Sequence, residues 1–193
     1  MLGTVVIAAG ILTACPTDSG GGDDGDPESF LGLTVNKTFS GITTSEAIDF
    51  TYIGNSTLSD LFNPGAEAKL TADGKFTLKL TEPKTLLDVT DFFGSGLTIT
   101  EGLQILNIST LYDGGSSIWT KYIMWRKDAN NSVLLTYANK DGSIKGTDSY
   151  GDTVNISLKK GWNTAIVSMS GSNGTAISGK PDASYKWVVL DKP

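Results

Sequence analysis

Apolar and polar residues alternate along several short segments of this 193-residue chain, and this alternation constrains the fold most. In residues 75–80 (Lys-Phe-Thr-Leu-Lys-Leu) every second side chain is apolar, and residues 48–52 and 154–159 repeat the pattern. A period of two places the apolar side chains on one face of a β-strand. Turn signals separate such segments at intervals of roughly eight to twelve residues, which predicts an all-β domain.

The clearest turn signal is Asp73-Gly74, which stands between residues 68–72 and residues 75–80. Asp-Gly is the preferred pair of a two-residue type I′ turn, because both central residues need a positive φ. Two other runs, residues 118–125 and 185–190, are apolar on both faces. They predict central strands, or strands that cross between layers.

These patterns predict one antiparallel β-sandwich over residues 30–193, with an up-and-down or partly open β-barrel as the alternative. Only residues 57–62 and 85–93 are expected to hold a helical turn or a short helix. A subdivision into two β subdomains near residues 83–96 stays open. The Gly content of 23 residues fits a protein rich in turns.

The N-terminal segment ends at the only cysteine of the chain. Residues 4–13 form an apolar run of about ten residues, which fits a secretory signal and is far below the roughly 20 that span a bilayer. The run ends in Leu-Thr-Ala-Cys at residues 12–15, which resembles the lipobox of bacterial lipoprotein signal peptides. The resemblance implies that Cys15 carries a diacylglycerol thioether and becomes the mature N-terminus. An ordinary cleaved signal or a hydrophobic N-terminal strand is the alternative. A signal is expected to begin with basic residues, and none precedes Lys37, so whether the given start is the true one stays open.

Residues 16–29 are rich in Gly and Asp and predict a disordered tether of about 20 Å mean reach. They hold five of the 21 acidic residues and no basic one, so the rest of the chain has 16 acidic and 15 basic residues. The net charge of −6 is therefore concentrated in the tether. Nothing in this distribution predicts a basic face for nucleic acid. The Asp cluster also lacks the spacing of a calcium loop.

Two segments resemble parts of poorly characterised bacterial surface proteins and lipoproteins that carry a transthyretin-like β-sandwich domain. One is residues 69–80, and the other runs from residue 135 to Gly161-Trp162-Asn163. The Gly-Trp-Asn strand end is the more specific of the two, since many β-hairpins share the first pattern. The resemblance implies an envelope β protein of transthyretin or immunoglobulin-like architecture, and it implies no catalytic residue.

The composition removes several kinds of catalytic site. The chain has no histidine, and its one cysteine is assigned to lipid. Thiol catalysis, zinc sites and histidine-based triads are therefore excluded. We expect no enzyme, no metal and no cofactor, although a hydrolase that uses two carboxylates, as glycoside hydrolases do, stays open.

Aromatic residues are the better candidates for a ligand site. Trp119, Trp125 and Trp162 are predicted either to form an exposed platform or to pack in the core. The six-residue spacing of Trp119 and Trp125 puts them on one face of a strand, with Tyr122 on the other.

These observations predict a lipoprotein anchored to a bacterial membrane through Cys15, with a non-catalytic binding or structural β domain. The expected partner, besides membrane lipid, is an envelope protein or a glycan. A surface carbohydrate-binding module that uses exposed aromatic residues is the alternative. Inner and outer membrane, periplasmic and surface-exposed positions, and the oligomeric state are left open.

Overall fold

A computed structural model describes residues 33–38, 46–93, 95–115 and 118–192 of the chain. The lipobox, Cys15 and the acidic tether lie outside the described residues, so the expectations for them stay predictions. Within the described ranges no helix is long and apolar enough to cross a membrane.

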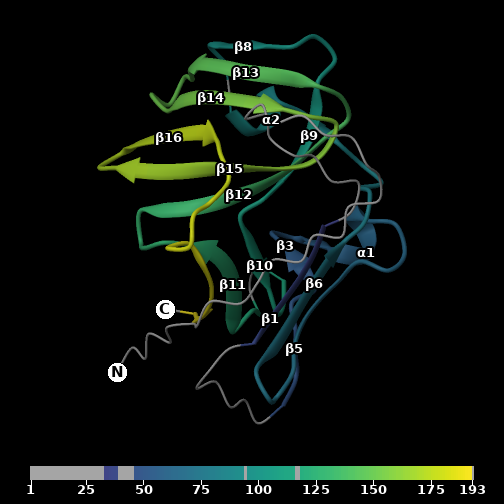
Figure 1. The fold of residues 1–193 in the computed structure, drawn as a ribbon. Helices are drawn as coiled ribbons and strands as arrows, with labels where there is room; N and C mark the ends of the chain where they lie inside the picture. Colours follow the sequence, from purple (N-terminus) through teal and green to yellow (C-terminus); the bar gives the residue numbers. More distant parts are fainter. Residues whose placement is uncertain (1–32, 39–45, 94, 116–117, 193) are drawn as a thin grey trace, which may run out of the picture.

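The strands form two sheets, which Figure 1 shows as a tall stack of strands beside a smaller sheet. The small sheet is antiparallel and has the order β1 (Leu33–Thr38), β6 (Lys75–Leu80), β5 (Glu67–Leu70) and β2 (Ile48–Asp49). The large sheet has the order β4 (Ser56–Thr57), β3 (Tyr52–Ile53), β10 (Thr110–Tyr112), β11 (Lys121–Arg126), β12 (Asn131–Ala138), β15 (Gly161–Ser170), β16 (Asn173–Ser178), β14 (Thr153–Leu158), β13 (Gly142–Thr147) and β8 (Leu97–Ile99).

Three further strands pair with members of the large sheet: β17 (Lys186–Asp191) with β11, β9 (Gln104–Ile108) with β12, and β7 (Leu87–Asp88) with β9. The helices α1 (Leu58–Leu61) and α2 (Thr90–Phe93) are single turns, as predicted. Neither sheet closes on itself, so the predicted all-β sandwich is confirmed and the barrel alternative is not.

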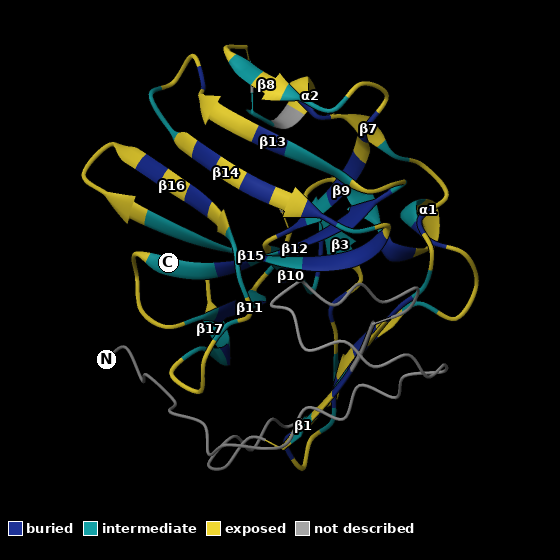
Figure 2. Ribbon diagram, turned by 45° about the horizontal axis from the view of Figure 1, so that its top comes forward, coloured by how far each residue is buried: buried dark blue, intermediate teal, exposed yellow. Residues whose placement is uncertain are grey.

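The strands β9, β12 and β15 bury side chains on both faces (Figure 2). On one face Leu135 belongs to a hydrophobic cluster that includes Phe76 of the small sheet. On the other face Ala138 belongs to a second cluster with Ile144 of β13 and Ile156 of β14. In the sheet order β15, β16 and β14 separate β12 from β13. Because β12 and β13 nevertheless share this cluster, the large sheet is curved between them. The first cluster includes residues that precede and residues that follow the segment 83–96, the predicted place of a subdivision.

The hairpin between β5 and β6 confirms the predicted alternation but not the predicted turn. Phe76 is buried, and Lys75 and Lys79 are exposed. The loop is longer than two residues, because the N–H of Thr71 donates to the Lys75 carbonyl and the N–H of Gly74 donates to the Thr71 carbonyl. Only one residue of a three-residue loop needs the left-handed conformation, and Gly74 takes it with φ of 83°.

The two runs that are apolar on both faces differ in position. β11 lies between β10 and β17, which confirms a central strand, although it begins at Lys121 and not at residue 118. The prediction of a central strand was wrong for β17: within the described part of the chain it pairs with β11 alone and is an edge strand. Its outward side chains Val188 and Leu190 are apolar and half-buried. The strand is therefore apolar on both faces although it lies at an edge.

The Gly-Trp-Asn segment at the start of β15 has a structural role. Gly161 turns the chain with φ of 102°, and Trp162 enters the first cluster. The buried Asn163 amide donates to the carbonyls of Lys159 and Gly161, and its oxygen accepts from the N–H of Lys159 at 2.9 Å. The segment therefore fixes the connection between β14 and β15.

Candidate functional site

Two of the three predicted platform residues lie in the core. Trp162 is 1% exposed and packs against Phe62 and Tyr137, with ring centroids 6.0 Å and 5.4 Å away. Trp125 is 8% exposed and stacks on Trp187, its register partner on β17, at 5.6 Å and an interplanar angle of 15°. An exposed platform therefore cannot include Trp125 or Trp162, because both indoles fill the space between the two sheets.

Trp119 takes a different position from the predicted one. It precedes β11, and the N–H groups of Ile118 and Trp119 both donate to the Gly115 carbonyl. The Trp119 ring lies against Tyr112 at 5.2 Å and Tyr122 at 5.5 Å, and not on the face of Trp125. The six-residue spacing does not put Trp119 on the face of Trp125, because β11 begins at Lys121 and the strand does not continue through residue 119.

Tyrosines from three strands extend this cluster into a row. Tyr112 of β10 lies between two register partners, Tyr52 of β3 and Tyr122 of β11. Tyr122 is in turn the register partner of Leu190 of β17. All four side chains are partly exposed. We call these four residues and Trp119 the outer aromatic face.

The outer aromatic face points away from the core because its chain neighbours point into it. Leu111, Ile123 and Val189 belong to or pack against the first hydrophobic cluster, and adjacent residues of a strand face opposite sides. Sequence reasoning missed Tyr52 and Tyr112. Each tyrosine stands next to an inward-facing apolar residue on a short strand, and this pattern could have indicated an outward position. The pairing of these strands, which brings the tyrosines together, could not be predicted from the sequence.

Charged groups surround the Trp119 end of the face. The Lys192 ammonium lies over the Trp119 ring, 4.9 Å from its centroid, and Lys121 forms an ion pair with Asp191. Burial raises the pKa of Asp113, but hydrogen bonds from the Thr120 hydroxyl and nearby backbone N–H groups outweigh it, so the pKa lies below its usual value. The Thr120 N–H donates to Asp113 at 2.8 Å. Asp113 is thus a carboxylate at neutral pH that holds Thr120, the residue after Trp119, through two hydrogen bonds.

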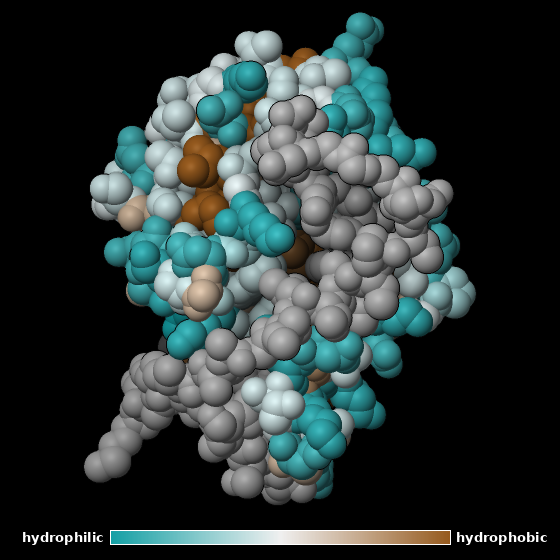
Figure 3. Space-filling model, viewed as in Figure 1, coloured by the Kyte–Doolittle hydropathy of each residue, from teal (hydrophilic) through white to brown (hydrophobic). Residues whose placement is uncertain are grey.

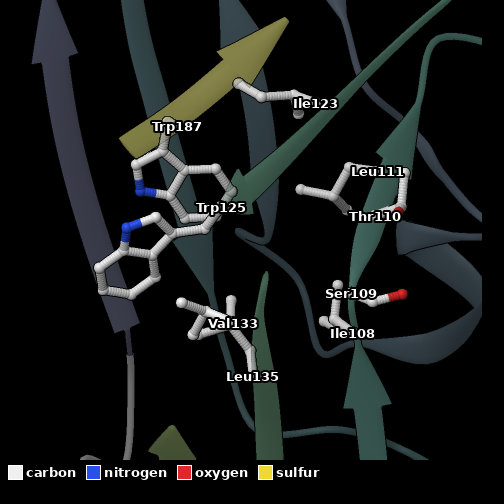
Figure 4. Close-up of a pocket in the computed structure, with 9 residues that line it drawn as sticks. All are labelled: Ile108, Ser109, Thr110, Leu111, Ile123, Trp125, Val133, Leu135 and Trp187. Carbon is white, nitrogen blue, oxygen red and sulfur yellow. The ribbon is translucent and has the colours of Figure 1, made fainter. Parts of the chain in front are cut away.

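The hollow in Figure 4 lies on the inner side of the same strands. The stacked pair Trp125 and Trp187 forms one wall, and the rest of the lining comes mostly from aliphatic side chains of β9 to β12. It leaves no room for a water molecule, so it is a packing gap within the core. In the described residues no group of three or more Asp, Glu or Cys is placed to hold a metal ion.

Figure 3 shows a described surface that is mostly hydrophilic or neutral, with an apolar spot over the region of β15 and β16. Ile177 of β16 is 49% exposed. Single exposed apolar residues are common on soluble domains, whereas a row of aromatic rings is a stronger sign of a contact surface. The outer aromatic face is therefore the best candidate site.

Comparison with protein-family models, with curated proteins and with solved structures finds no match for this chain.

Proposed function

We propose that this chain is a lipid-anchored binding protein of the bacterial cell envelope, in which the outer aromatic face of the β domain contacts another envelope component. The observation that carries the binding role is the row of partly exposed rings formed by Tyr52, Tyr112, Trp119 and Tyr122. Large rigid rings give contact area at a small cost in side-chain entropy, and they are enriched in binding surfaces.

The anchor rests on the sequence. The Leu-Thr-Ala-Cys motif at residues 12–15 and the acidic segment after it support a lipidated Cys15 that holds the domain off the membrane by a short tether. Two or three acyl chains are enough for stable anchoring, whereas one chain binds only weakly and reversibly. The inner and the outer membrane, with a periplasmic or a surface-exposed domain, are both compatible with this anchor.

Replacing Cys15 with Ala tests the anchor. We expect the Cys15→Ala chain to lose palmitate labelling and to leave the membrane fraction, or to accumulate with its signal uncleaved, because the thioether cannot form. Replacement of Ala14 with Gly is the matched control, since a small residue is kept before the cysteine. Palmitate labelling and membrane recovery of Cys15→Ala equal to the wild type would overturn the anchor.

Loss of the rings tests the binding face. In a full chain carrying Cys15→Ala, so that lipid does not contribute, we expect Trp119→Ala to weaken co-sedimentation with envelope fragments by roughly fivefold to 30-fold. This is the effect of losing about 1–2 kcal/mol at a central aromatic contact. Tyr150→Ala is the matched control, because Tyr150 is 76% exposed on a different loop. Equal binding by the Trp119 and Tyr150 variants would rule out the face.

Carbohydrate is a second, narrower candidate ligand for this site. The specific observation is that Trp119 and two tyrosines meet at centroid distances of 5.2 Å and 5.5 Å beside polar side chains such as Thr120 and Asp113. Ring faces suit the apolar faces of sugars, and neighbouring polar groups suit sugar hydroxyls.

A further inference from the structure

Two positive charges stand directly opposite each other at the end of the outer aromatic face. Arg126 of β11 and Lys186 of β17 are register partners, on the opposite side of their strands from Trp125 and Trp187. Like charges in this position destabilise a strand pair. Both side chains are half-buried, and neither forms an ion pair with a carboxylate of the described part of the chain.

The basic and aromatic groups lie on the same side of the sheet. Along β11, every second residue points to the same side, so Tyr122, Met124 and Arg126 share one face. At roughly 3.4 Å per residue, the aromatic end and the basic end are about 14 Å apart. Lys192 adds a third cation at the aromatic end, where its ammonium lies over Trp119. Because the Asp113 carboxylate also lies at that end, the net positive charge of the face is at Arg126 and Lys186, and Met124 separates it from the rings.

We propose that the outer aromatic face binds an anionic polysaccharide, with sugar rings on Trp119 and Tyr122 and acid groups on Arg126 and Lys186. This inference rests on the proposed function and names the ligand of the same site. Arg binds carboxylate or sulfate through two parallel hydrogen bonds, and an anion between Arg126 and Lys186 removes their mutual repulsion.

The shape of the face favours a polysaccharide over a lipid surface. The rings of Tyr112, Trp119 and Tyr122 are half-buried and contact one another, so they do not protrude as membrane-inserting residues do. A strip about 14 Å long without a pocket suits an extended polymer whose charges repeat along its length.

A pair of polymers with the same sugar ring separates the charge from the ring contribution. Polygalacturonate carries one carboxylate per sugar, and its methyl ester carries none. For the full chain with Cys15→Ala, we expect polygalacturonate to bind and the methyl ester to bind at least tenfold more weakly. We expect Arg126→Gln with Lys186→Gln to weaken polygalacturonate binding at least tenfold and to leave the binding of the methyl ester unchanged.

The matched control is Lys79→Gln with Lys145→Gln, which removes the same charge from exposed positions elsewhere. Folding of each variant is checked by urea unfolding, where neutralising Arg126 and Lys186 is expected to cause no loss of stability. Equal binding of both polymers, or an equal effect of the control pair, would overturn the anionic ligand while the aromatic face stands. Stronger binding to anionic lipid vesicles or to single-stranded DNA than to polygalacturonate would also overturn it. If Trp119→Ala also leaves envelope binding intact, the proposed function is overturned together with the anionic ligand.

Discussion

Trp162→Ala is expected to lower the free energy of unfolding by about 3–5 kcal/mol, which is the usual cost of emptying a large aromatic site in a core. Trp162 is 1% exposed and contacts Phe62 from the segment beside α1 and Tyr137 from β12. Its removal therefore leaves a cavity between the two sheets, whose strands cannot close the gap without losing their register. Urea unfolding followed by circular dichroism measures the change.

Trp162→Phe separates volume from polarity. The indole Nε1 of Trp162 is buried without a hydrogen-bond partner in the described structure. Phe restores part of the volume and removes this unpaired donor, so we expect it to cost clearly less than Ala. Trp119→Ala is the control, because Trp119 is partly exposed and lies before β11. A loss for Trp162→Ala no larger than for Trp119→Ala would show that Trp162 does not hold the sheets together.

The strands could be predicted from the sequence because their signal is local. Phe76, Leu78 and Leu80 are buried as expected, and so are Val154 and Ile156, since a period-two pattern needs only one strand to be read. The short helices within residues 57–62 and 85–93 could be predicted for the same reason.

The outer aromatic face could not be predicted because it depends on pairing between distant strands. Tyr52, Tyr112 and Tyr122 become neighbours only when β3, β10 and β11 are placed side by side, and Arg126 meets Lys186 across 60 residues of chain. The sequence does not specify these partners. The spacing of Trp119 and Trp125 was also misleading, because β11 begins between them and Trp119 packs against Tyr112 and Tyr122 on the other face.

The free energy of unfolding is expected to fall as the pH rises from 10 to about 12, with Tyr137 responsible for part of the fall. Burial, together with the hydrogen bond from its hydroxyl to Glu82 and the negative charge of Glu82, raises the pKa of Tyr137 to about 12. The unfolded chain loses this proton near pH 10, whereas the folded chain keeps it. Unfolding therefore releases a proton between these values, and each pH unit removes up to about 1.4 kcal/mol of stability.

Tyr137→Phe and Glu82→Gln identify the contribution of this phenol. The Phe variant has no proton to lose, so its stability should fall less steeply than that of the wild type above pH 10, after a loss of roughly 0.5–1.5 kcal/mol at pH 7 for the missing hydrogen bond. Glu82→Gln should keep part of the steep region, because burial is the largest single cause of the raised pKa and remains in this variant. Parallel curves for the wild type and the Phe variant between pH 9 and 12 would mean that Tyr137 titrates like an exposed tyrosine, which its 2% exposure argues against.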